Sequence, residues 1–164
     1  MNVLGITGAI GWDGNIPAAM WDCDIFGDFW VHGSGATLIM NGELKNSLHE
    51  ERFSRIKYDG RYPELSIEKI LDQNKLTKYD IDFVVYVCGA PKITFALKLL
   101  GYIEEKLQEY FPNCKVEFLS HHLAHTAATY YTSGCEEANV LTFDGAGDYE
   151  LQSDGRWLLP HMKF

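Results

Sequence analysis

The stretch "KVEFLSHHLAHTAATYYTSG", residues 115–134, contains a strand, a helix start and a helix end in immediate succession. "KVEFL" predicts a short strand. Ser120 directly after it is a suitable N-cap residue, and Gly134 is a residue that commonly closes a helix. We therefore predict a strand over 115–119 that leads straight into a helix over 120–133, a strand–helix unit of an α/β protein.

Strand signals flank this unit on both sides. The apolar runs 2–7 ("NVLGIT") and 80–90 ("DIDFVVYVCGA") predict buried strands, and 139–144 ("NVLTFD") predicts another. Residues 36–51 predict a hairpin around Asn41-Gly42, a residue pair favoured in type I′ turns. A second hairpin is expected around Asp154-Gly155.

Two further helices complete the pattern. Residues 66–76 place Ile67, Ile70 and Leu71 on one helical face, with Ser66 as the expected N-cap. Residues 91–111 predict a long amphipathic helix that begins with a proline and stops before Pro112. A strand, a hairpin and then alternating helices and strands predict a mixed sheet with helices packed on it.

Composition narrows the function classes. The chain has 164 residues and is 46% hydrophobic, the size and apolar content of one globular domain. Its net charge of -9 argues against a binder of the nucleic-acid backbone. Four cysteines without a CxxC spacing indicate reduced thiols. With no signal peptide and no apolar run long enough for a membrane span, we expect a cytoplasmic protein.

The histidines of the opening stretch are spaced for a shared ligand. His121 and His125 lie four residues apart, so on a helix they project about 40° from each other on one face. Two imidazoles placed in this way can bind one divalent metal. His122 projects about 100° away from His121. The alternative is a partly buried helix whose histidines are satisfied by other hydrogen bonds.

The motif "LTFDGAGD", residues 141–148, follows one helix and one turn later. Asp144 ends a predicted strand, where ligands collect in α/β sheets. Gly145 and Gly147 would let backbone N–H groups approach a phosphate closely. Asp144 is therefore a candidate third metal ligand in a credible phosphate loop. A tight polar turn has the same pattern and is the alternative.

Two motifs near the hairpin complete the candidate site. "HGSGATLIMNGE", residues 32–43, begins with His32 and a small-residue turn that could cradle a phosphate or be merely a turn. "HEERFSRIKYDGR", residues 49–61, carries Lys57 and three arginines. These cations are either partners for anionic substrate groups or a solvated face.

Together these motifs resemble the carbamoyltransferase family of NodU and the tobramycin and cephalosporin O-carbamoyltransferases. The matching stretches lie at 3–6, 32–44, 49–59, 120–134 and 141–148, in the family's order. The resemblance implies an α/β fold, the actin-like (ribonuclease H-like) mixed sheet with flanking helices. It also implies transfer of a carbamoyl group from carbamoyl-adenylate to a hydroxyl of a small molecule, with a YrdC-like domain making the adenylate from carbamoyl phosphate and ATP.

The resemblance suggests a role for each candidate residue. His121 and His125 look like ligands of a divalent metal, iron first, with manganese or zinc as alternatives. Asp144 looks like an active-site carboxylate at or near the metal, and His122 is the candidate base or phosphate contact. The expected nucleotide or substrate contacts are His32, Lys57, Gly145 and Gly147.

This sequence departs from the family pattern in three places, and these limit which family properties can be inferred for it. His32-Gly33 stands where the family usually has His-Asp, and residues 9–31 look like an insertion. We expect the first lobe over 1–137 and the opening strands of a second lobe over 138–164, so that the remainder and the YrdC-like domain are missing. On this expectation the chain alone is inactive, and exposed apolar surface favours self-association.

Two other functions stay open from the sequence. One is the related threonylcarbamoyl transfer to tRNA. The net negative charge of the chain argues against this function. The other is a non-catalytic actin-like module that binds a nucleotide or a partner.

Overall fold

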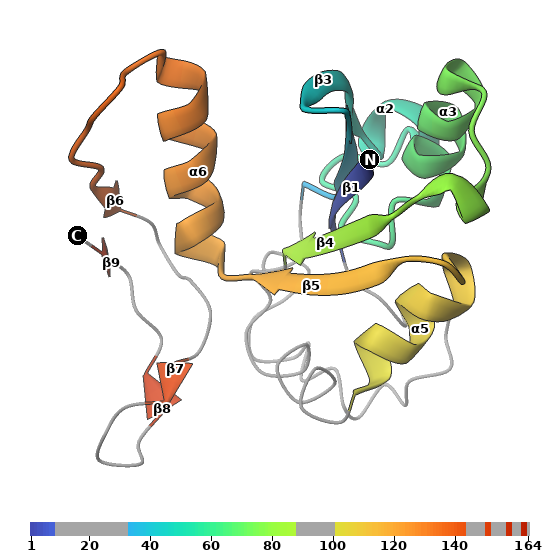
Figure 1. Cartoon of the computed structure of the whole chain (residues 1–164). Helices are drawn as coiled ribbons and strands as arrows, with labels where there is room; N and C mark the ends of the chain where they lie inside the picture. The colour runs from blue at the N-terminus through green and yellow to red at the C-terminus, as the bar shows by residue number, and fades with distance from the viewer. Residues whose placement is uncertain (9–32, 88–100, 144–149, 152–156, 159–161, 164) are drawn as a thin grey trace.

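The computed structural model describes residues 1–8, 33–87, 101–143, 150–151, 157–158 and 162–163. The expected insertion at 9–31, Cys88, the first part of the helix expected at 91–111 and the turn around Asp154-Gly155 lie outside these residues. Figure 1 shows the described elements along the chain.

A five-stranded sheet forms the centre of the described structure. Its strand order is β3-β2-β1-β4-β5. The strands are β1 (Asn2–Thr7), β2 (Gly35–Met40), β3 (Glu43–His49), β4 (Phe83–Val87) and β5 (Lys115–Leu119). β2 pairs antiparallel with β1 and with β3. β4 pairs parallel with β1, and β5 pairs parallel with β4. This order and these directions are those of a ribonuclease H-like sheet, so the predicted fold class, a mixed sheet of the actin-like type with flanking helices, is confirmed.

The hairpin between β2 and β3 turns where the sequence predicted. Asn41 and Gly42 both have positive φ angles, 52° and 85°. A type I′ turn needs positive φ at both of its central residues, and Asn-Gly tolerates this best. The turn therefore sets the register in which Met40 lies opposite Glu43.

Two helices cover one face of the sheet. They are α3 (Glu64–Asn74) and α5 (Tyr102–Tyr110). Because successive side chains of a strand point to opposite faces of the sheet, every second residue faces these helices. The buried core consists of Leu4, Ile6, Ala36, Leu38, Ile67, Ile70, Ile81, Val84, Tyr86, Ile103, Leu107, Phe111 and Val116.

The N-terminus of α3 corrects one prediction. The helix begins at Glu64 rather than after an N-cap at Ser66, which is its third residue and fully buried. The cap comes instead from Glu50, whose carboxylate accepts hydrogen bonds from the backbone N–H groups of Leu65 at 3.0 Å and Ser66 at 2.8 Å. The Ser66 hydroxyl donates a third bond to it at 2.7 Å. A residue distant in sequence thus replaces the expected local cap.

The helix expected over 91–111 is also corrected within the described residues. α5 begins only at Tyr102, because Gly101 has a φ of 72° and cannot continue a right-handed helix. The C-terminal end at Tyr110 agrees with the prediction that the helix stops before Pro112.

The described C-terminal segments are short strand pairs. β6 (Thr142–Phe143) pairs with β9 (Met162–Lys163), and β7 (Glu150–Leu151) pairs with β8 (Trp157–Leu158). The second pairing confirms the predicted tail hairpin. The strand predicted over 139–144 is wrong for 139–141, which are not extended strand. The division into two lobes at residue 137 stays a prediction.

Candidate metal and ligand site

Two of the candidate motifs, residues 49–61 and 120–134, begin at one edge of the sheet. β1, β4 and β5 run parallel, so their carboxyl ends lie at the same edge. β3 also ends there, since Gly35 at the start of β2 is paired with both Thr7 and His49. Ligands of α/β proteins bind outside the carboxyl ends of parallel strands. The 50–61 segment and the helix that follows β5 therefore begin where a ligand is expected.

Helix α6 (His121–Ser133) positions the three histidines. Ser120 caps it by accepting a hydrogen bond from the Leu123 N–H at 3.4 Å, and Gly134 ends it with a φ of 73°. Both ends confirm the sequence prediction. In Figure 1 the arrowheads of β4 and β5 point toward the first turn of α6, which places the histidines at the carboxyl edge of the sheet.

His121 and His125 face each other across one helical turn. Their Nε2 atoms are 3.0 Å apart, and their ring centroids are 4.5 Å apart with an interplanar angle of 86°. Two nitrogens that each lie about 2.1 Å from one ion at cis or tetrahedral angles are roughly 3.0–3.4 Å apart. The spacing of this pair therefore fits two ligands of one divalent metal, and it equally fits a hydrogen bond from one ring to the other.

A third ligand is not found within the described parts of the chain. No group of three His, Cys, Asp or Glu side chains with a metal-binding arrangement occurs among those residues. Asp144, the expected carboxylate, lies outside them, as do His32, Gly145 and Gly147.

His122 lies on the inward face of α6. Its side chain is 3% exposed, and its ring meets that of His121 edge-on at 5.7 Å. Its Nε2 atom has no hydrogen-bond partner among the described residues. A buried imidazole nitrogen without a partner is unfavourable, so this atom is positioned to accept or donate a further bond.

Lys57 projects from the segment that follows β3. It is exposed, and its ammonium lies 4.8 Å from the centroid of the Tyr58 ring. Arg52 and Arg55 of the same segment are exposed as well. Exposure of these cations agrees with both interpretations of the run, so their role stays a prediction.

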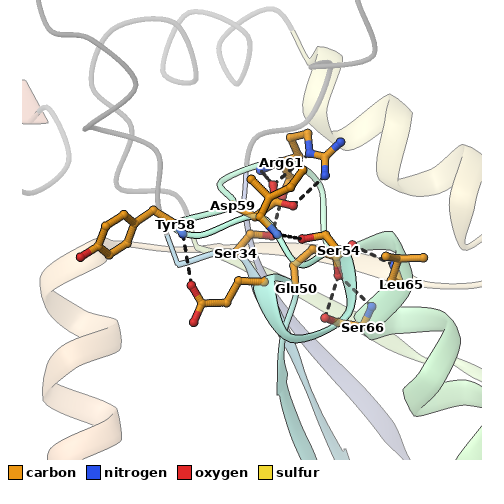
Figure 2. Close-up of polar contacts among 10 residues, drawn as sticks. Ser34, Glu50, Ser54, Tyr58, Asp59, Arg61, Leu65 and Ser66 are labelled. Atoms are coloured by element: carbon orange, nitrogen blue, oxygen red, sulfur yellow. Dashed lines mark hydrogen bonds and ion pairs between the residues drawn. The ribbon is translucent and has the colours of Figure 1, made fainter.

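Two acids of the same segment, Glu50 and Asp59, are buried. Glu50 is 3% exposed and Asp59 is 4% exposed. Figure 2 shows both carboxylates turned inward into polar contacts, with Ser54 near Asp59. Arg61 binds Asp59 through its Nε at 2.9 Å and its Nη2 at 2.7 Å. The sequence carries no local signal for this burial, because it depends on where α3 and β2 pack.

Asp59 makes the fold sensitive to acid. Hydrogen bonds from the Arg61 side chain, and to a smaller extent from Ser54, lower the pKa of Asp59 to about 2. Because the folded pKa lies below that of an unfolded chain, the stabilisation is present above about pH 4 and is lost as the pH falls toward 2. We expect the wild type to lose about 2 kcal/mol of unfolding free energy from this group over that range. Asp59→Asn should flatten this part of the pH dependence in urea titrations, and an unchanged slope would contradict the assignment.

Known proteins resemble this chain over part of their length. Nodulation protein NolNO of Sinorhizobium fredii is 29% identical over 138 residues, which are 73% of this chain and 20% of that protein. An uncharacterized protein of Synechocystis is 26% identical over 82% of this chain and 28% of its own length. An uncharacterized protein of Methanocaldococcus jannaschii is 31% identical over 71% of this chain and 21% of its own length.

The chain is a homologue of NolNO. It spans about a fifth to a little over a quarter of the length of these curated relatives. No model of a known protein family matches it. Among solved structures, YeaZ from Pseudomonas aeruginosa is similar with a TM-score of 0.46 and 13% identity, covering 97% of this chain and 63% of that one. The fold class stated above rests on the strand order and not on this likeness.

Within the described residues, no helix is long and apolar enough to cross a membrane.

Proposed function

We propose that this chain forms the carbamoyl-transferring part of an O-carbamoyltransferase that modifies a hydroxyl of a small molecule. The observation that carries the proposal is the His121–His125 pair, with its Nε2 atoms 3.0 Å apart at the carboxyl edge of the sheet. The order of the motifs and the homology to NolNO support it.

The histidine pair would hold a divalent ion, with iron as the first candidate and manganese or zinc as alternatives. A site of two imidazoles and one carboxylate suits these metals, so we propose Asp144 as the oxygen ligand. The ion, when bound, would supply a Lewis acid that polarises the carbamoyl group. Lys57 would neutralise phosphate charge, and His32 and the glycines at 145 and 147 would contact the nucleotide.

The proposed transfer conserves atoms and charge. The acceptor hydroxyl oxygen attacks the carbamoyl carbon, and the bond from that carbon to the phosphate oxygen of the adenylate breaks. AMP leaves with the bonding electron pair, and the hydroxyl proton passes to a base. His122 is our candidate for this base, because its Nε2 has no hydrogen-bond partner among the described residues.

Titration of Mn²⁺ by calorimetry tests the metal site. We expect one site in the wild type and loss of uptake in His125→Ala, with little loss of stability because this side chain is exposed. His122→Ala should retain metal uptake and lose stability, since its ring is buried. Thr129→Ala, one turn further along α6, is the matched control. Equal uptake by the wild type and His125→Ala would mean that the pair does not bind metal.

A second titration tests the substrate class. A non-hydrolysable carbamoyl-adenylate analogue should bind the Mn²⁺-loaded wild type more tightly than AMP does, and Lys57→Ala should weaken both ligands. Metal binding that is normal while the analogue and AMP bind equally would leave a metal site but refute carbamoyl transfer.

A further inference from the structure

A shallow hollow, open to solvent, lies between α2 (Glu51–Ser54) and α3. Its volume is about 490 Å³. In Figure 1, α3 lies at the right and α6 at the left, with β1 and β3 between them in this view. It is lined by Arg52, Phe53, Arg55, Leu65, Glu68, Lys69 and Asp72.

The buried residue Glu50 connects α2 and α3, which form the two sides of the hollow. Glu50 directly precedes α2, and its backbone carbonyl accepts hydrogen bonds from the N–H groups of Phe53 and Ser54, both at 2.9 Å. Its side chain meanwhile caps α3 through Leu65 and Ser66. One residue therefore connects both helices.

The hollow combines an apolar surface with charged side chains, among which Arg52 is paired with Glu51 at 3.9 Å. The Phe53 and Leu65 side chains remain 37% and 40% exposed in it. Lys69 is paired with Asp72 at 3.6 Å. Among the described residues, no ion pair joins Arg52 or Arg55 to the acids of α3. Two guanidinium groups thus stand beside exposed apolar side chains in a chain whose net charge is -9.

We propose that this hollow binds a small monocarboxylate with an apolar body. Guanidinium groups recognise carboxylates through paired N–H donors, and the apolar body would cover Phe53 and Leu65. Glu68 on the facing wall opposes a second negative charge, which favours one carboxylate over two. The volume is within the range of small-molecule sites.

Titration of phenylacetate, followed by two-dimensional amide NMR, tests this site. We expect saturable shifts of residues 51–55 and 64–72, and binding of the neutral phenylacetamide that is weaker by about tenfold. The double variant Arg52→Ala/Arg55→Ala should lose about the same factor while its spectrum stays folded. Lys115→Ala, an exposed cation on β5, should bind as the wild type does.

Three outcomes would overturn the proposal. They are equal binding of the acid and the amide, the absence of saturable shifts around α2 and α3, and unchanged binding by the double arginine variant. The test involves no metal titration, so failure of the monocarboxylate proposal can be distinguished from failure of the proposed transferase function.

Discussion

Glu50→Ala is expected to lower the free energy of unfolding by about 3–5 kcal/mol. The substitution removes the acceptor of three hydrogen bonds at the start of α3. The Ser66 N–H and hydroxyl would then be left without this partner at a position with 0% exposure. Each buried polar group that loses its partner costs about 1–3 kcal/mol.

Urea unfolding followed by circular dichroism measures this effect. Glu50→Gln should lose less, because its amide oxygen still accepts a hydrogen bond. The control is Glu109→Ala, which removes an exposed ion pair with Lys106 and should cost less than about 1 kcal/mol. If Glu50→Ala is no more costly than Glu109→Ala, the carboxylate does not hold α2 and α3 together.

Gly8→Ala is expected to destabilise the fold by about 2–4 kcal/mol. Gly8 has a φ of 139°, which side chains rarely adopt. A methyl group there would lie 2.6 Å from the Ser34 Oγ and in contact with the Arg61 carbonyl oxygen. These two groups are hydrogen-bonded to each other, and the Gly8 carbonyl accepts a bond from the buried Tyr86 hydroxyl at 2.5 Å. The new group therefore cannot be accommodated without breaking contacts that join β1, β2 and the 50–61 segment.

Gly5→Ala is the matched control, in the strand β1 that ends just before Gly8. Its nearest contact for an added methyl group is the Thr37 carbonyl oxygen at 3.8 Å, an ordinary van der Waals distance. Thermal unfolding should show a large decrease in Tm for Gly8→Ala and little change for Gly5→Ala. Similar Tm values for the two variants would show that the close approach at Gly8 is not a constraint.

Much of the candidate site was predictable because its signals are local. The spacing of His121 and His125 determines their common helical face, whatever surrounds the helix. The third metal ligand was predicted as Asp144, and that prediction remains untested because the residue lies outside the described part of the chain. His122 was expected beside the pair, whereas its burial at 3% exposure depends on what packs against α6.

Elements whose signals lie within a few residues of each other could be predicted without the structure. Asn41-Gly42 specifies its turn, Ser120 and Gly134 specify the ends of α6, and alternation of helices and strands specifies the mixed sheet. In each of these elements, the side chain that accepts the backbone hydrogen bond, or the residue that tolerates a positive φ, is close in sequence to the position that requires it.

Contacts between segments far apart in the chain become apparent only in the folded molecule. The cap of α3 comes from Glu50, 15 residues before Leu65, and not from the nearby Ser66. Asp59 reads as one more charge in an exposed run, yet it is buried against Arg61 and close to β2. A carboxylate is buried only where folding brings enough donors to offset its lost hydration, and no pattern of neighbouring residues reveals where those donors will be.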